Sequence, residues 1–150
     1  MTGPLRPLPR RAVQGRKQTW APLTAAAVAA TLLCGCGAPA ARVDGARQAG
    51  VAFEQALADA DYGRACALMA PQTREELEDN EGKPCGPALE GQDLSAAGGE
   101  PDTQVYGRQA LLRLPDDTLF LSQFADGWKV TAAGCAPQTS EPYRCSVKGG

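Results

Sequence analysis

Residues 45–61 carry apolar side chains at intervals of three and four positions, which is the spacing of one face of an α-helix. Polar residues, Glu54 among them, lie off this face. The sequence Asp61-Tyr62-Gly63 then interrupts the pattern. A second short helix follows, with apolar residues Ala65, Cys66, Leu68 and Met69. Pro71 ends this helix, because proline disfavours the helical conformation of the residue before it.

A third helical segment starts at residues 71–73, where Thr73 and Glu76 have the spacing of a capping box. Its acidic residues suit the N-terminal end of a helix; they are Glu75, Glu76, Glu78, Asp79 and Glu81. A cation site is conceivable there, but the cluster lacks the spacing and central glycine of a calcium loop. We therefore interpret it as a solvated helix face. Residues 85–90 predict one further turn, and residues 91–102 a polar loop.

From residue 103 onward the pattern favours β-strands. Runs at 105–114 and 118–124 flank the turn sequence Pro115-Asp116-Asp117, and Asp126-Gly127 predicts a tight hairpin leading into a run at 127–133. A last run covers residues 143–148. Asp116, Asp117 and Asp126 are interpreted as turn residues rather than acid/base groups, because turns favour aspartate. Helices followed by strands predict one α+β domain over residues 46–150, with the helices on one face of an antiparallel sheet of about four strands.

The first 35 residues have the layout of a secretory signal peptide. Residues 1–17 carry five basic and no acidic side chains, and an apolar stretch follows at 21–33. Leu33-Cys34-Gly35-Cys36 then resembles the lipobox of bacterial lipoproteins, in which the last cysteine receives a diacylglyceryl group before cleavage. The resemblance implies a lipidated Cys36, a tether over residues 36–45, and a domain on the outer face of the cytoplasmic membrane.

Other interpretations of the leader stay open. Residues 18–41 are uncharged and long enough to span a bilayer as an uncleaved anchor, and ordinary cleavage would release the domain. The pair Arg10-Arg11 also invites comparison with a twin-arginine export signal, although the flanking residues do not continue that motif.

Composition narrows the range of functions. Residues 36–150 have a formal charge of −7, because the basic leader lies outside them. An acidic domain lacks the basic face that nucleic-acid binding requires. The chain also contains no histidine, which removes the usual general base and the usual metal ligand. We expect no nucleic-acid partner, cofactor, metal or catalytic residue.

Four cysteines remain beyond the lipobox: Cys66, Cys85, Cys135 and Cys145. An even number in an exported chain predicts disulfides, and three pairings are possible. We favour Cys66–Cys85, which would tie the second helix to the loop after the third, and Cys135–Cys145, which would join the last two strands. A cysteine-only zinc site is disfavoured, because no two of these cysteines are two to four residues apart.

Two stretches carry a family resemblance. Residues 56–69, with the Ala-x-x-Asp-Tyr turn, resemble the first helix pair of the ketosteroid-isomerase-like superfamily, and residues 127–145 are similar to the end of small actinobacterial lipoproteins of that fold. The resemblance implies a cone-like domain with a curved sheet, whose cavity sometimes holds a small apolar ligand. Enzymes of the superfamily place Asp, His or Tyr in that cavity, but no acidic residue here matches a catalytic position.

Aromatic residues in the predicted strands supply the candidate ligand-binding side chains, Tyr106, Phe120 and Trp128. The function that follows is a membrane-anchored, non-catalytic domain that binds a protein partner or a small apolar ligand at the cell envelope. Two alternatives remain: an enzyme that uses a cavity Asp or Tyr without histidine, and a structural accessory subunit of an envelope complex.

Overall fold

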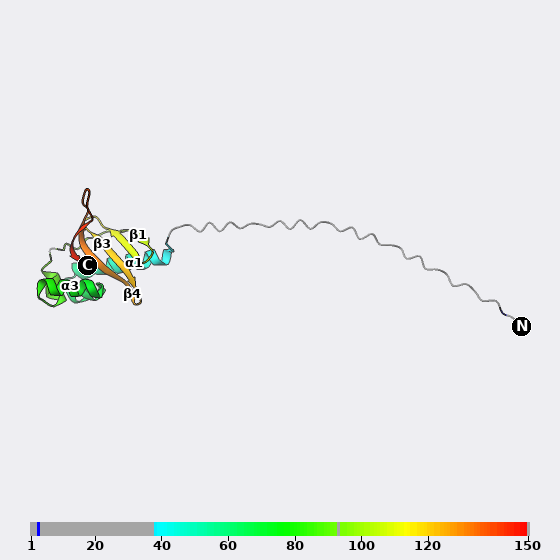
Figure 1. The fold of residues 1–150 in the computed structure, drawn as a ribbon, viewed down its shortest axis with the longest axis horizontal. Coiled ribbons are helices and arrows are strands. Elements are labelled where there is room, and N and C mark those ends of the chain that lie inside the picture. Colours follow the sequence, from blue (N-terminus) through cyan, green and yellow to red (C-terminus); the bar gives the residue numbers. More distant parts are fainter. Residues whose placement is uncertain (1–2, 4–37, 93, 150) are drawn as a thin grey trace. The chain divides into compact units, whose positions relative to one another are not determined.

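The structure is a computed structural model that describes residues 3, 38–92 and 94–149 (Figure 1). In these ranges the chain first forms helices and then an antiparallel sheet, as the sequence predicts. The helices are α1 (Ala40–Ala58), α2 (Tyr62–Leu68), α3 (Pro71–Glu81) and α4 (Cys85–Glu90). The strands are β1 (Asp102–Tyr106), β2 (Gln109–Arg113), β3 (Thr118–Phe124), β4 (Gly127–Ala136) and β5 (Arg144–Lys148).

The sheet has five strands in the order β1-β2-β3-β4-β5, so the expected number of about four was too low. The difference arises within residues 105–114, which were expected to form one strand. The chain turns back at Gly107 and Arg108, and Tyr106 of β1 pairs with Gln109 of β2. Gly107 makes this turn with a φ of 57°, a left-handed conformation that glycine adopts without steric cost.

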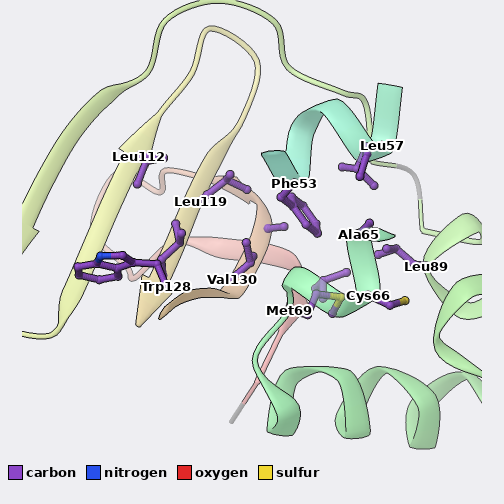
Figure 2. Packing of buried hydrophobic residues seen from close by; sticks show 14 of the residues in the cluster. Phe53, Leu57, Ala65, Cys66, Met69, Leu89, Leu112, Leu119, Trp128 and Val130 are labelled. Carbon is purple, nitrogen blue, oxygen red and sulfur yellow. The ribbon is translucent and has the colours of Figure 1, made fainter. Parts of the chain in front are cut away.

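Helix α1 packs across the inner face of the sheet and contacts β1, β2, β3 and β4. Gly50 allows the close approach, since a Cβ atom there would lie 2.3 Å from Cδ2 of Leu112. Phe53, one turn along, is fully buried between the strands and α2 (Figure 2). The space between helices and sheet is filled mainly by Phe53, Leu89, Leu112, Leu119, Leu121, Val130 and Thr73, which are the largest fully buried side chains.

The start of α1 lies earlier in the chain than expected. The helix begins at Ala40, inside the stretch 36–45 that was expected to be a tether, and it ends at Ala58 rather than near residue 61. Ala60 has a φ of 52°, which is incompatible with a right-handed helix. This left-handed residue separates α1 from α2, which starts two residues later.

Helices α2 and α3 both contact β4. Asp61 caps α2 by accepting a hydrogen bond from the Arg64 amide, and the Ala70 amide donates to the Val130 carbonyl. Pro71 is the first residue of α3, so Thr73 lies within the helix and does not cap it as expected. The Thr73 hydroxyl is buried instead and donates to the Thr131 carbonyl at 3.2 Å.

The structure contains both expected disulfides. Cys66–Cys85 joins α2 to α4, and Cys135–Cys145 joins facing positions of β4 and β5. Each half of the domain therefore carries one covalent cross-link.

Candidate functional site

The three aromatic residues expected to bind a ligand do not come together. Trp128 lies on the inner face of the sheet, buried against Gly45 of α1 and 5.9 Å from the guanidinium carbon of Arg42. Phe120 and Tyr106 lie on the opposite face, because their strand partners alternate with the buried ones. The structure therefore divides the predicted site between core and surface.

The outer face of the sheet, opposite α1, carries half-buried and exposed side chains. We call it the open face, and its half-buried or exposed residues include Gln104, Tyr106, Gln109, Leu111, Arg113, Phe120, Ser122, Phe124, Lys129 and Thr131. At its centre the rings of Phe120 and Tyr143 meet edge to face with centroids 5.2 Å apart. The neighbouring hydroxyl of Tyr143, followed by Asp102, raises the pKa of Arg113.

Hollows of about 510 and about 430 Å³ adjoin this face. The first includes Arg113, Thr118, Tyr143 and the β2–β3 turn in its wall, and the second lies between Ser122, Phe124 and the start of α3. The open face thus combines aromatic rings, cationic side chains and hydrogen-bonding side chains with two depressions, a mixture common in non-obligate protein interfaces.

A second feature is a pair of buried carboxyl groups that the sequence did not predict. Glu54 of α1 is only 5% exposed. Its Oε2 accepts a hydrogen bond from the Ala97 amide at 2.6 Å, and its Oε1 is buried without a hydrogen-bond partner in the described structure. Burial raises the pKa of Glu54 to about 7, the Ala97 hydrogen bond opposes the rise, and the charge of Asp117 adds to it.

Asp117 holds the β2–β3 turn against β4. Its Oδ1 accepts from the amides of Thr118 at 2.5 Å and Cys135 at 2.9 Å, and its Oδ2 accepts from Gly134 at 3.1 Å. Burial raises the pKa of Asp117, although these three hydrogen bonds oppose the rise. Asp117 lies in a turn, as predicted, and its hydrogen bond with Thr118 is local. Its other two hydrogen bonds join the turn to β4, which the sequence did not predict.

The segment 94–99 lies over both carboxyl groups. Leu94 and Ser95 line the hollow of about 510 Å³, and residues 96–99 line a smaller one of about 180 Å³ that also includes Glu54. Ala97, in the middle of the segment, is itself buried. The hydrogen bond from Ala97 to Glu54 therefore ties this otherwise irregular segment to α1.

A sequence signal for Glu54 existed. Gly50, Phe53, Glu54 and Leu57 follow the three-and-four spacing of a single helix face, so Glu54 shares the face of two core residues. Because Glu54 is not apolar, the pattern of apolar residues alone placed it off the buried face of the helix. The positions that cover it, residues 94–99, have no periodicity that would place them over α1.

Three further acidic residues make contacts that do not involve the buried carboxyl groups. Glu78 accepts from the Cys85 amide at 3.0 Å and Glu81 from the Gln92 side chain at 2.9 Å, while Asp126 pairs with Lys129 at 3.3 Å. Among the residues that the structure describes, no group of three or more Cys, Asp or Glu has the geometry to hold a metal ion.

The predicted signal peptide and the predicted lipidation site at Cys36 lie outside the described residues. Within the described ranges no helix has the length and apolar character needed to cross a membrane. Comparison of the chain with models of protein families, with curated proteins and with solved structures gives no match. The similarity to the ketosteroid-isomerase-like superfamily therefore stays a prediction based on residues 56–69 and 127–145.

Proposed function

We propose that this protein is an exported lipoprotein, anchored through Cys36 to the outer face of the cytoplasmic membrane, whose domain binds a protein partner at the cell envelope without catalysing a reaction. The observation that supports export is the pair of disulfides, Cys66–Cys85 and Cys135–Cys145. Structural disulfides persist in oxidising compartments outside the cytoplasm and are rare within it.

A protein partner is favoured over a small apolar ligand by the filling of the core. A ligand cavity of the expected kind would lie between the helices and the sheet, where Phe53, Leu112 and Val130 are fully buried. The accessible mixture of aromatic and polar groups lies on the open face instead. A shallow, mixed surface suits a macromolecular partner better than the enclosed apolar pocket that small ligands prefer.

The mass of the mature protein tests the anchor and the export together. Membranes of the native host would be solubilised, and the intact mass measured with thiol alkylation before and after reduction. We expect a chain that begins at a diacylated Cys36, with four thiols that react only after reduction. An unprocessed chain with free thiols would contradict both parts of the proposal.

Site-specific photo-crosslinking tests the partner. A benzophenone amino acid would replace Leu111 on the open face, and in a control chain it would replace Val51, which is 42% exposed on α1. Irradiated membranes should give a discrete protein adduct from position 111 that is much weaker from position 51. Equal adducts from both positions, or an adduct with a small molecule only, would argue against a protein-binding open face.

Glu54 favours a second candidate function, an enzyme of the ketosteroid-isomerase-like kind that works without histidine. A carboxyl group with a pKa of about 7 beside a hollow has the properties of a general base. A thermal-shift screen of small carbonyl compounds tests this role with the wild-type chain and the Glu54→Gln variant. Compounds that stabilise only the wild type would identify ligands that depend on Glu54, and conversion of such a compound by the wild type alone would support catalysis. A uniform absence of such compounds would leave Glu54 as a structural residue.

A further inference from the structure

The early start of α1 shortens the link between the expected anchor and the folded domain. Cys36 is followed by Gly37, Ala38 and Pro39, and α1 begins at Ala40. An extended chain advances at most about 3.6 Å per residue, so the Cα atoms of residues 36 and 40 are separated by no more than roughly 14 Å. A lipid on Cys36 would therefore hold the first turn of α1 close to the phospholipid headgroups.

Arg42 determines which other parts of the domain lie beside this first turn. Its Nη2 donates to the Gly107 carbonyl in the β1–β2 turn and, at 2.8 Å, to the side-chain oxygen of Gln123 near the end of β3. Its guanidinium also lies over the ring of Trp128 at the start of β4. The start of α1, the β1–β2 turn and the β3–β4 turn thus form one end of the domain.

Exposed aromatic side chains are concentrated at this end. Tyr106 is 64% exposed and Phe124 is 36% exposed, and in the described part of the chain only Val51 joins them as an exposed large hydrophobic residue. Strand register places both aromatic residues on the open face, where Gln109 pairs with both Tyr106 and Ser122, two residues before Phe124. Tyrosine and other amphipathic aromatic residues are favoured at the membrane–water interface.

The charges at this end differ from those of the whole domain. Arg42 and the exposed Arg108 are cationic, whereas Asp126 in the β3–β4 turn is paired with Lys129 and Asp44 of α1 is paired with Arg47. Arg108 uses its Nη2 to hold the Gln123 carbonyl and retains further N–H groups for a phosphate oxygen. The acidic helix α3 lies at the left of the domain in Figure 1, while α1 begins at its right.

From these observations we propose that the end formed by Ala40, Ala41, Tyr106, Arg108, Phe124 and Ala125 docks on an anionic phospholipid surface. The two aromatic rings enter the headgroup region, and Arg108 binds lipid phosphate. This inference rests on the proposed lipid anchor, because the anchor brings this end and no other to the bilayer. Docking would fix the orientation of the domain and leave the centre of the open face, around Leu111 and Phe120, accessible to a partner.

Depth-dependent fluorescence quenching tests the docking. The full chain would be expressed with its leader, purified in its lipidated form and placed in vesicles of phosphatidylglycerol and phosphatidylcholine that contain a nitroxide headgroup lipid. Two variants, Phe124→Trp and Val51→Trp, would be compared with the wild-type chain, whose Trp128 gives the background. We expect the added tryptophan at position 124 to be quenched several-fold more than that at position 51, and the contrast to shrink without phosphatidylglycerol.

A second set of variants separates docking from anchoring. Tyr106→Ser combined with Arg108→Glu, in the Phe124→Trp chain, should reduce quenching several-fold while the lipid on Cys36 and sedimentation with vesicles stay unchanged. Equal quenching at positions 51 and 124 in a lipidated chain would overturn the docking inference and leave the anchor intact. A chain without lipid on Cys36 would overturn the proposed anchor and the inference with it, and the intact mass distinguishes these two results.

Discussion

At the scale of single residues, Glu54 makes the free energy of unfolding depend on pH. Its pKa is about 7 in the folded chain against an ordinary value of 4.5, and burial is the main cause. Between these two pH values the folded chain retains a proton that the unfolded chain has released. The free energy of unfolding therefore falls as the pH rises from 4.5 to 7, and above pH 7 this loss is complete and does not change further with pH.

Glu54→Gln should remove this pH dependence, because glutamine stays neutral and its oxygen can still accept from the Ala97 amide. We expect the free energy of unfolding of the variant to exceed that of the wild type at pH 8 by up to about 3 kcal/mol, and to match it closely at pH 4. Urea denaturation across this range measures the difference. Glu90→Gln, at an exposed position, is the control and should follow the wild type. Parallel curves for all three chains would show that the Glu54 proton does not affect folding.

Asp117 should behave differently, because its carboxylate accepts three backbone hydrogen bonds that an amide cannot replace. In Asp117→Asn the amide nitrogen would face at least one of the donors on Thr118, Gly134 and Cys135. We expect a loss of about 2 kcal/mol or more in the free energy of unfolding at pH 7. The neighbouring Asp116→Asn provides a matched control, since Asp116 is exposed, and it should change stability little. Equal losses in both variants would exclude the hydrogen bonds as the cause.

At the scale of elements, the contact between α1 and the sheet depends on the absence of a side chain at residue 50. Gly50→Ala would gain about 1 kcal/mol in helix propensity, but it forces its methyl group against Leu112, and overpacking of a filled core costs about 1–3 kcal/mol. We expect net destabilisation. In Gly63→Ala the nearest atom would be Oδ1 of Asp61 at 3.7 Å, so that control in α2 should stabilise by up to about 1 kcal/mol. Thermal or urea unfolding of both variants distinguishes packing from propensity, because propensity alone would give both changes the same sign.

The elements also show how far the sequence determines the fold and where local patterns fail. The order of helices before strands and the hairpin at Asp126-Gly127 were predictable, because each depends on residues close together in the chain. The β1–β2 turn was missed because one glycine, Gly107, reverses a run that reads as continuous strand. Glu54 was assigned to the solvent-exposed side because its burial depends on residues 94–99, far along the chain. The three predicted ligand-binding aromatic residues do not form one site, because strand alternation places Phe120 and Trp128 on opposite faces of the sheet.

At the scale of the whole molecule, one disulfide cross-links the helical part of the domain and the other cross-links the sheet. Cys66–Cys85 has a sequence separation of 19 and joins two short helices, whereas Cys135–Cys145 has a separation of 10 and joins the last two strands. By loop-closure entropy each contributes roughly 3 kcal/mol to the free energy of unfolding. A domain of this size is stable by about 5–15 kcal/mol, so both cross-links together supply a large share of it.

Removing the cross-links one at a time should therefore lower stability in two comparable steps. We expect Cys66→Ala with Cys85→Ala, and separately Cys135→Ala with Cys145→Ala, each to lower the free energy of unfolding by roughly 3 kcal/mol. Urea denaturation of the oxidised variants measures each step, and the wild type reduced and alkylated under the same conditions should show their sum. The chain lacking all four of these cysteines serves as the control, because a reductant should leave its stability unchanged. If the reduced wild type were as stable as the oxidised protein, the domain would fold equally well in a reducing cytoplasm, and the disulfides would no longer support export.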